Sequence, residues 1–337
     1  MENKIRVFLN SGLHSAGRGV GYYAQFLSEA LAKLKEIELT DKDPDIIHFP
    51  FFDLFYPTLP FRKEIPTVVT IHDLTPLVMS DRYPKGVKGG ISLLYQFLSL
   101  RSVKAVITDS HNSKDDIVRL LHIQDDKVYI IPLAVDPEYS RPVSSSDLKR
   151  IRAQYNLPDK FLMCISVGPN PNKNLPALAK VTEKLGMPLV LVGKGLLQEI
   201  KESVHPELRD LVELRTFKHI IYIGFVPTKD LNGFYKLATI YCQPSLYEGF
   251  GLPILEAMTA GCLITCSNTS SLPAIYHQTA LVFNPTDLSD IESTIRKALS
   301  LSPKERESQI NAGLKRSRDF TWNQTAQATL EVYKKVI

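Results

Sequence analysis

The sequence predicts an α/β fold made of two doubly wound, Rossmann-like domains that face a central cleft. Three observations predict it. The chain has 337 residues, which is more than one hydrophobic core usually serves. Short apolar runs rich in β-branched residues alternate with helix-length segments, as in parallel sheets that are covered on both faces. A stretch rich in proline, serine and charged residues, 132–158, interrupts this alternation near the middle of the chain.

The first half of the chain contains candidate strands and helices in alternation. The candidate strands are the apolar runs 5–9, 46–49, 67–71, 105–108 and 128–131. The helical patterns, in which apolar residues recur at spacings of three and four, are 20–34, 91–102 and 113–121. Together these elements predict a first domain over residues 1–140.

The second half repeats the pattern after a segment, 141–159, that we interpret as a linker. Its candidate strands are 161–167, 189–192, 220–223, 240–243, 263–266 and 281–283. They predict a second domain over residues 160–319. Because doubly wound sheets bind ligands beyond the carboxyl ends of their strands, two such domains predict a site in the shared cleft.

The composition is that of a globular enzyme and excludes several classes of protein. The chain is 44% hydrophobic and 23% charged. Its net charge is only +4 and its lysines and arginines are spread along the sequence, which argues against nucleic acid as a partner. Cys164, Cys242, Cys262 and Cys266 lie in or beside apolar runs, so we expect buried core residues rather than disulfides or a zinc site. The apolar run 5–9 is too short for a signal sequence and no later run is long enough to span a bilayer, so we expect a cytoplasmic protein.

The most informative stretch, 244–261, has the sequence PSLYEGFGLPILEAMTAG. A loop with Glu248 follows a candidate strand, and Pro253 marks the first turn of a helix that should end at Gly261. The N–H groups and the positive end of such a helix suit a diphosphate. Glu256 lies eight residues after Glu248, so both carboxylates can face the cleft and accept hydrogen bonds from vicinal hydroxyls.

This string resembles the E-x7-E signature of retaining glycosyltransferase family four, which has the GT-B fold, and the whole chain is similar to its mannosyltransferase branch. The resemblance implies that Glu248 contacts the donor sugar as a catalytic residue and that Glu256 binds the ribose hydroxyls of the donor. It also implies that the amides of Phe250, Gly251 and Leu252 hold the sugar and its phosphate. A surface acidic pair beside an ordinary turn is the alternative interpretation of this string.

A second glycine cluster, GRGVGYY at 17–23, opens the first helical pattern. Flexible backbone lets such a loop approach phosphate closely, although the spacing is not that of the dinucleotide fingerprint. The cluster is similar to the family's G-I-G-R-Y element, whose loop lies over the donor diphosphate and the acceptor. This implies Gly19 on the donor side and Arg18 and Gly21 on the acceptor side. Glycines that serve only helix packing are the alternative.

His72 and Asp73 come just after the candidate strand 67–71, at the expected edge of the cleft. In the family that this chain resembles, the matching histidine contacts the transferred sugar, which implies a catalytic role for His72 and an acceptor-side position for Asp73. A histidine that only caps the end of a strand is the alternative.

The loop 168–174, GPNPNKN, follows the first strand of the second domain. A cation at the start of a helix is unfavourable unless an anion joins it, so Lys173 predicts a phosphate there. The loop resembles the family's R-K-N element, with Asn172 at the position of the usual arginine. This implies that Asn172 and Lys173 bind the donor and that Lys173 is catalytic, with Arg18 available to replace the missing charge. Val226 matches a position whose backbone meets the nucleobase in relatives.

Two further segments bear on the fold and on metals. The segment 320–337 resembles the family's closing helix, which crosses back to pack on the first domain; a plain amphipathic end helix is the alternative. Asp43-Pro44-Asp45 superficially matches the metal-binding D-x-D of other glycosyltransferases, but it directly precedes a strand and we interpret it as a turn. We therefore expect no metal site.

The resemblance implies a retaining hexosyltransferase that needs no cofactor, in which fixed N–H dipoles and a cation stabilise the leaving diphosphate. We expect GDP-mannose as the donor, with a UDP-sugar as the alternative, and a glycan or lipid-linked acceptor. Three other classes remain open: a sugar-nucleotide epimerase or hydrolase, a non-catalytic nucleotide-sugar sensor and, more distantly, a nicotinamide oxidoreductase.

The segment 82–104 suggests peripheral association with the inner face of a membrane. The apolar run 91–100 is flanked by basic residues, a mixture suited to an anionic surface: Arg82, Lys85, Lys88, Arg101 and Lys104. The same run at helical spacing would serve equally well as a helix packed in the core with a solvated basic rim.

Overall fold

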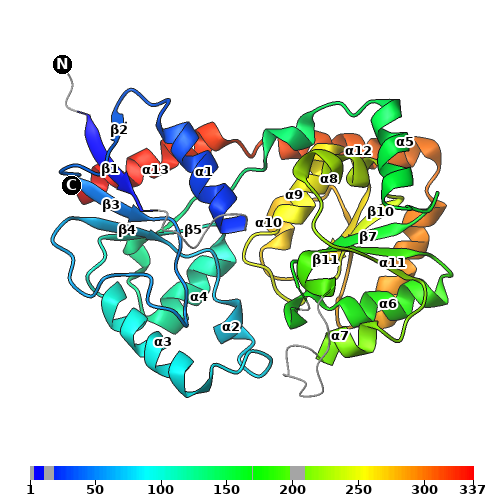
Figure 1. Cartoon of the computed structure of the whole chain (residues 1–337), viewed down its shortest axis with the longest axis horizontal. Helices are drawn as coiled ribbons and strands as arrows, with labels where there is room; N and C mark the ends of the chain where they lie inside the picture. Colours follow the sequence, from blue (N-terminus) through cyan, green and yellow to red (C-terminus); the bar gives the residue numbers. More distant parts are fainter. Residues whose placement is uncertain (1–3, 11–18, 169, 198–208) are drawn as a thin grey trace. The chain divides into compact units, whose positions relative to one another are not determined.

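The computed structural model describes residues 4–10, 19–168, 170–197 and 209–337 (Figure 1). The chain divides into two compact units. The first comprises Met1–Asp136 together with Phe320–Ile337, and the second comprises Pro137–Asp319. Each unit is built on one six-stranded sheet in which every described pair of neighbouring strands is parallel.

The sheet of the first unit has the strand order β2-β1-β3-β4-β5-β6. Its strands are β1 (Ile5–Leu9), β2 (Ile37–Leu39), β3 (Ile46–Phe49), β4 (Thr67–Thr70), β5 (Ala105–Thr108) and β6 (Val128–Ile130). The strands β4 and β5 are buried along their whole length, because helices cover both faces of the sheet.

Helices cover the two faces of this sheet as separate layers (Figure 1). They are α1 (Gly19–Leu31), α2 (Thr75–Val78), α3 (Gly86–Leu100), α4 (His111–Leu121) and α13 (Trp322–Val336), with the 3-10 turn η1 (Asp125–Lys127). One core joins β3 to β6 with α3 and α4, and contains Val69, Leu100, Val106 and Ile117. On the other face α1 packs beside α13.

A chain of buried hydrogen bonds attaches α13 to this sheet. His48 Nδ1 lies 2.7 Å from the Tyr333 hydroxyl, and its Nε2 lies 2.8 Å from Thr70 Oγ1. Thr70 Oγ1 also meets the Tyr23 hydroxyl at 3.1 Å. Burial lowers the pKa of His48 to about 3, so the ring is neutral. The predicted return of the C-terminal helix to the first unit is confirmed.

The sheet of the second unit has the order β12-β11-β10-β7-β8-β9. Its strands are β7 (Leu162–Ile165), β8 (Leu189–Val192), β9 (Ile220–Ile223), β10 (Ile240–Gln243), β11 (Ile264–Ser267) and β12 (Leu281–Phe283). The helices are α5 (Ser145–Gln154), α6 (Leu175–Lys184), α7 (Arg209–Leu214), α8 (Thr228–Leu237), α9 (Leu252–Ala260), α10 (Leu272–Tyr276), α11 (Leu288–Ser300) and α12 (Pro303–Ser317). Short 3-10 turns are η2 (Pro137–Ser140), η3 (Pro171–Lys173) and η4 (Lys194–Leu197).

Every strand that the sequence predicts is present, with ends shifted by at most two residues. The sequence missed β2, which has three residues and pairs only with β1 at the sheet edge. Helix α3 starts at Gly86, five residues earlier than predicted, because its first turns contain three glycines that carry no apolar signal. The four cysteines are buried and free, as predicted.

The segment 141–159, which the sequence predicts as a linker, instead holds helix α5 within the second unit. Ser144 caps this helix by accepting a hydrogen bond from the Asp147 N–H. The helix packs on α8 through the buried Ile151, and a Cβ at Gly233 would lie 2.3 Å from Ile151 Cδ1. Leu148 also lies near Gly233, so α5 has apolar residues at a spacing of three, which the sequence analysis missed because the segment is otherwise rich in serine and charged residues.

Candidate active site

In the second unit, the loops after β7 and β10 meet at the carboxyl edge of the sheet. The chain runs outward from β7 through β8 to β9 and then returns to the other side of β7 as β10. This reversal of strand order is where open α/β sheets bind their ligands. The two loops that leave this point carry Lys173 and Glu248, so both lie where the sequence placed them, at the carboxyl ends of strands.

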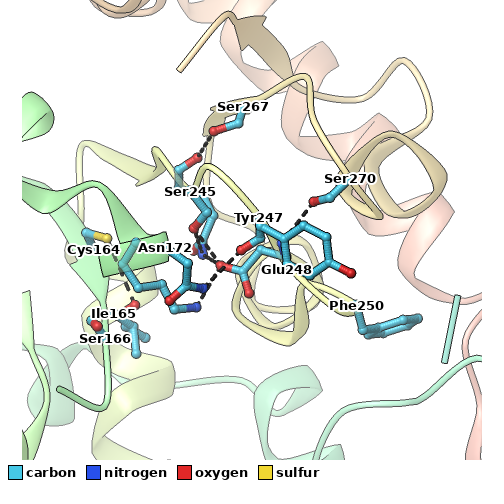
Figure 2. Close-up of polar contacts among 12 residues, drawn as sticks. Cys164, Ile165, Ser166, Asn172, Ser245, Tyr247, Glu248, Phe250, Ser267 and Ser270 are labelled. Carbon is cyan, nitrogen blue, oxygen red and sulfur yellow. Dashed lines mark hydrogen bonds and ion pairs between the residues drawn. The ribbon is translucent and has the colours of Figure 1, made fainter. Parts of the chain in front are cut away.

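The Glu248 carboxylate stands at the centre of this site (Figure 2). Its Oε1 accepts a hydrogen bond from Lys173 Nζ at 2.7 Å and others from Gln243 Nε2 and Ser245 Oγ at 2.5 Å. The side chains of Glu248 and Lys173 are only 10% and 13% exposed. Burial of either charge alone would be costly. Each group is stable in the buried site because the other provides a charged partner.

Serine and asparagine side chains hold the backbone around Glu248 (Figure 2). The Glu248 N–H donates to Ser270 Oγ, and Ser271 Oγ donates to the carbonyl groups of Glu248 and Phe250. Asn172 is buried, and its Nδ2 donates to the Tyr247 carbonyl at 3.0 Å. The side chain of Asn172 therefore ties the Lys173 loop to the Glu248 loop, a structural role that the sequence analysis did not foresee.

Helix α9 begins directly after this loop. Gly251 is its N-cap and has a φ of +113°, a region that side chains rarely adopt, and a Cβ there would lie 2.7 Å from Leu272 Cδ2. Leu252 begins the helix, which ends at Gly261 as predicted. The positive end of the helix dipole thus lies beside Glu248 and Lys173, which is a favourable place for an anionic group.

Glu256 lies on the second turn of α9 and is held by a buried tyrosine. The hydroxyl of Tyr235, on α8, donates to Glu256 Oε2 at 2.8 Å. Burial and the nearby Glu256 carboxylate raise the pKa of Tyr235 well above its usual value, so the phenol keeps its proton. The hydrogen bond fixes the direction of the Glu256 carboxylate.

In the first unit, His72 lies two residues after β4 and pairs with Asp109, which follows β5. His72 Nδ1 is 2.8 Å from Asp109 Oδ2, and the ring edge meets the Tyr23 ring with centroids 4.8 Å apart. Burial opposes a charge on His72, but the Asp109 carboxylate outweighs it and the pKa of His72 is raised. Asp109 therefore fixes the Nδ1–H tautomer of a ring at the carboxyl edge of this sheet.

The remaining predicted residues are less informative. Gly19 and Gly21 are in the first turn of α1, while Arg18 lies outside the described residues. Asp73 accepts a hydrogen bond from the Thr75 N–H at the start of α2. Val226 is buried just after β9.

Asp43-Pro44-Asp45 lies in a bend before β3, as predicted, and its second carboxylate has a structural partner. Asp45 pairs with the Arg6 guanidinium at 3.0 Å and accepts a hydrogen bond from the Arg6 N–H. The guanidinium of Arg6 lowers the pKa of Asp45. Within the described part of the chain, no group of three His, Cys, Asp or Glu side chains could hold a metal ion.

The second unit places a cation and a helix N-terminus beside two fixed carboxylates, an arrangement that suits a phosphorylated sugar. Comparisons with known families show to which family the chain belongs. The family described as group 1 glycosyl transferases matches residues 147–316, and glycosyltransferase family 4 matches residues 7–139. The chain belongs to the family 4 glycosyltransferases. The two six-stranded parallel sheets of this glycosyltransferase are those of the GT-B fold.

Two relatives and one solved structure illustrate the similarity. The glycosyltransferase is 32% identical to O-antigen chain mannosyltransferase B of Escherichia coli over 305 residues, which cover 88% of this chain and 76% of the relative. It is 28% identical to the serotype-specific mannosyltransferase WbdA of Escherichia coli over 92% of this chain, but spans only 39% of WbdA. The structure of Anabaena Alr3699/HepE in complex with UDP and glucose matches with a TM-score of 0.71 and 15% identity, covering 98% of this chain and 99% of that one.

Sequence reasoning missed the residues that orient the site of this glycosyltransferase. Gln243 and Ser245 donate to Glu248, Tyr235 donates to Glu256, and Asp109 pairs with His72. Gln243 and Ser245 gave a signal, because polar side chains at the end of a buried strand need a partner. Asp109, directly after the buried strand β5, gave the same signal, whereas Tyr235 gave none, because its partner comes from another helix.

Proposed function

We propose that this glycosyltransferase moves mannose from GDP-mannose to the end of a lipid-linked envelope glycan of the O-antigen type, with retention of anomeric configuration and without a metal. The observation that carries the proposal is the Lys173–Glu248 pair beside the N-terminus of α9, with Glu256 held by Tyr235. The similarity to O-antigen chain mannosyltransferase B supports the sugar and the class of acceptor.

In this proposal the donor lies along the carboxyl edge of the second sheet. Glu256 accepts hydrogen bonds from the ribose hydroxyls, the backbone beside Val226 meets the base, and Lys173 with the amides of Phe250 to Leu252 holds the diphosphate. Glu248 accepts hydrogen bonds from hydroxyls of the sugar. His72, from the first unit, contacts the transferred sugar, and Arg18, Gly21 and Asp73 meet the acceptor.

The same groups account for the chemistry. As the bond between the anomeric carbon and the diphosphate oxygen breaks, the sugar becomes cation-like and the diphosphate gains negative charge. Lys173 and the dipole of α9 stabilise that charge more in the transition state than in the ground state. The leaving phosphate accepts the proton of the acceptor hydroxyl, which attacks from the same face, so the configuration is retained.

A panel of donors tests the proposal. The protein is incubated with GDP-mannose, UDP-glucose and UDP-galactose, each with and without a lipid extract of a cell envelope, and the nucleotide released is identified. We expect GDP release that requires the extract and a glycolipid that gains one hexose. Release of UDP rather than GDP would show that the donor is a UDP-sugar, the alternative that the UDP in the HepE structure suggests. Turnover of the donor alone would favour a hydrolase or an epimerase.

A further inference from the structure

Helix α3 presents its apolar side chains to solvent. Val87, Ile91, Leu94 and Leu98 recur at spacings of four, three and four and form one stripe along the helix. They are 82%, 67%, 59% and 36% exposed. A helix that merely covers a sheet shows charged or polar residues on this side, so the stripe needs an explanation.

The inner face of α3 combines apolar packing with buried polar contacts, because Leu100 belongs to the core and Leu93 and Phe97 pack against it. Gln96 is fully buried, and its Nε2 donates to the Asp53 carbonyl, the Tyr56 carbonyl and Thr58 Oγ1. Ser99 is also fully buried and donates to the Pro60 carbonyl. These buried polar groups fix the orientation of the helix, because each would be costly to bury without its partner.

The same contacts fix the loop 53–62 beside the stripe, and this loop carries two exposed aromatic rings. Tyr56 and Phe61 are 74% and 55% exposed, and the Phe61 ring lies 6.0 Å from that of Tyr95 on α3. Exposed aromatic rings beside an apolar surface are typical of the boundary between lipid and water.

The charged residues of the segment 82–104 all have one sign. Residues 82–104 contain two arginines and three lysines and neither aspartate nor glutamate, and all five cations are exposed. Arg101, at the end of the stripe, also lines a cavity of about 300 Å³ together with His122 and Lys127. Arg101 and Lys127 are therefore two cations in a lining that is otherwise largely apolar.

We infer that α3 and the loop 53–62 form a docking surface for an anionic lipid bilayer, with α3 lying in the plane of the interface and its stripe among the lipid chains. The cationic border favours anionic headgroups, and the exposed rings fit the same depth. A second copy of the chain is a poor occupant, because its five cations would face five like charges. The inference complements the lipid-linked acceptor but does not depend on it.

Vesicle flotation tests this surface without any donor or acceptor. The protein is mixed with vesicles of phosphatidylcholine alone or with phosphatidylglycerol, at low and high salt. We expect flotation only with the anionic vesicles, lost at high salt. Ile91→Ser with Leu94→Ser should lower the partition coefficient by at least about tenfold, and Lys85→Gln with Lys88→Gln by roughly 30-fold at low salt.

The control is Val282→Ser with Leu288→Ser, which changes two exposed apolar residues of the second unit, 41% and 44% exposed. It should float like the wild type. Fluorescence of Trp322 and far-ultraviolet circular dichroism show that each variant is folded. Equal flotation with neutral and anionic vesicles, or full flotation of the Ile91→Ser and Leu94→Ser variant, would overturn the inference. The inference would also be overturned if analytical ultracentrifugation showed a wild-type dimer that the Ile91→Ser and Leu94→Ser variant does not form.

Discussion

Lys173 Nζ lies 2.7 Å from Glu248 Oε1, although the two residues are 75 positions apart in the chain. The contact joins the loop after β7 to the loop after β10, the two loops that leave the reversal point of the second sheet. A donor diphosphate and the anomeric carbon of its sugar are adjacent in the molecule, so a cation and a carboxylate that serve them must be adjacent as well. This pair is therefore the basis of the predictions on catalysis.

Replacing Lys173 with alanine should lower kcat by about 100-fold or more, because the charge that develops on the leaving diphosphate loses a buried cation. Lys180→Ala on α6 is the matched control, since that lysine is half-exposed and pairs with Glu213. Steady-state kinetics with GDP-mannose measure both variants. A Lys173→Ala enzyme with wild-type kcat would remove this residue from the site.

Replacing Glu256 with alanine should weaken the binding of a nucleoside diphosphate by about 1.5–3 kcal/mol, because the ribose hydroxyls lose a charged acceptor. Tyr235→Phe should weaken it less, by about 1 kcal/mol, because the carboxylate remains but loses its fixed direction. Titration calorimetry measures both, with Glu307→Ala on the exposed face of α12 as the control. Unchanged affinity in Glu256→Ala would contradict the proposed ribose contact.

Transfer should continue at its normal rate after exhaustive chelation. In the proposed mechanism Lys173 and α9 supply positive charge for the leaving group, and Asp45, the second carboxylate of the D-x-D string, is paired with Arg6. The rate is compared before and after treatment with EDTA, with added manganese as the second arm. A rate that falls with EDTA and returns with manganese would show that a metal takes part.

Acid should destabilise the first unit through His48. Unfolded His48 binds a proton near the usual pKa of 6.5, but the buried ring resists protonation down to a pKa of about 3, so stability falls as the pH drops between these values. From pH 7 to pH 5 the loss is about 2 kcal/mol.

The difference between the wild type and His48→Gln isolates this effect from the other histidines, including His72, whose raised pKa acts in the opposite direction. Urea unfolding followed by the single tryptophan, Trp322, reports on the first unit, because Trp322 packs on Phe26 and donates to the Val135 carbonyl. An equal loss in both proteins would show that His48 does not carry the pH dependence.

The sequence by itself determined the class of the fold, every strand of the two sheets except β2, and the string from Glu248 to Glu256. These features are local: a buried strand leaves a continuous apolar run, and a helix with proline at its start and glycine at its end carries its own signals. The resemblance to family 4 glycosyltransferases rests on the same short strings, which is why it could be recognised without coordinates.

Only the tertiary structure decided which groups orient the site and which face of α3 is outside. Tyr235 contacts Glu256 from another helix, and Asp109 contacts His72 from the end of another strand. The amide of Asn172 donates to the backbone of a neighbouring loop. The spacing of apolar residues in α3 is the same whether its stripe faces in or out; the buried hydrogen bonds of Gln96 settle the direction. Contacts between residues distant in sequence depend on how helices and strands pack. The spacing of apolar residues along the chain does not specify that packing.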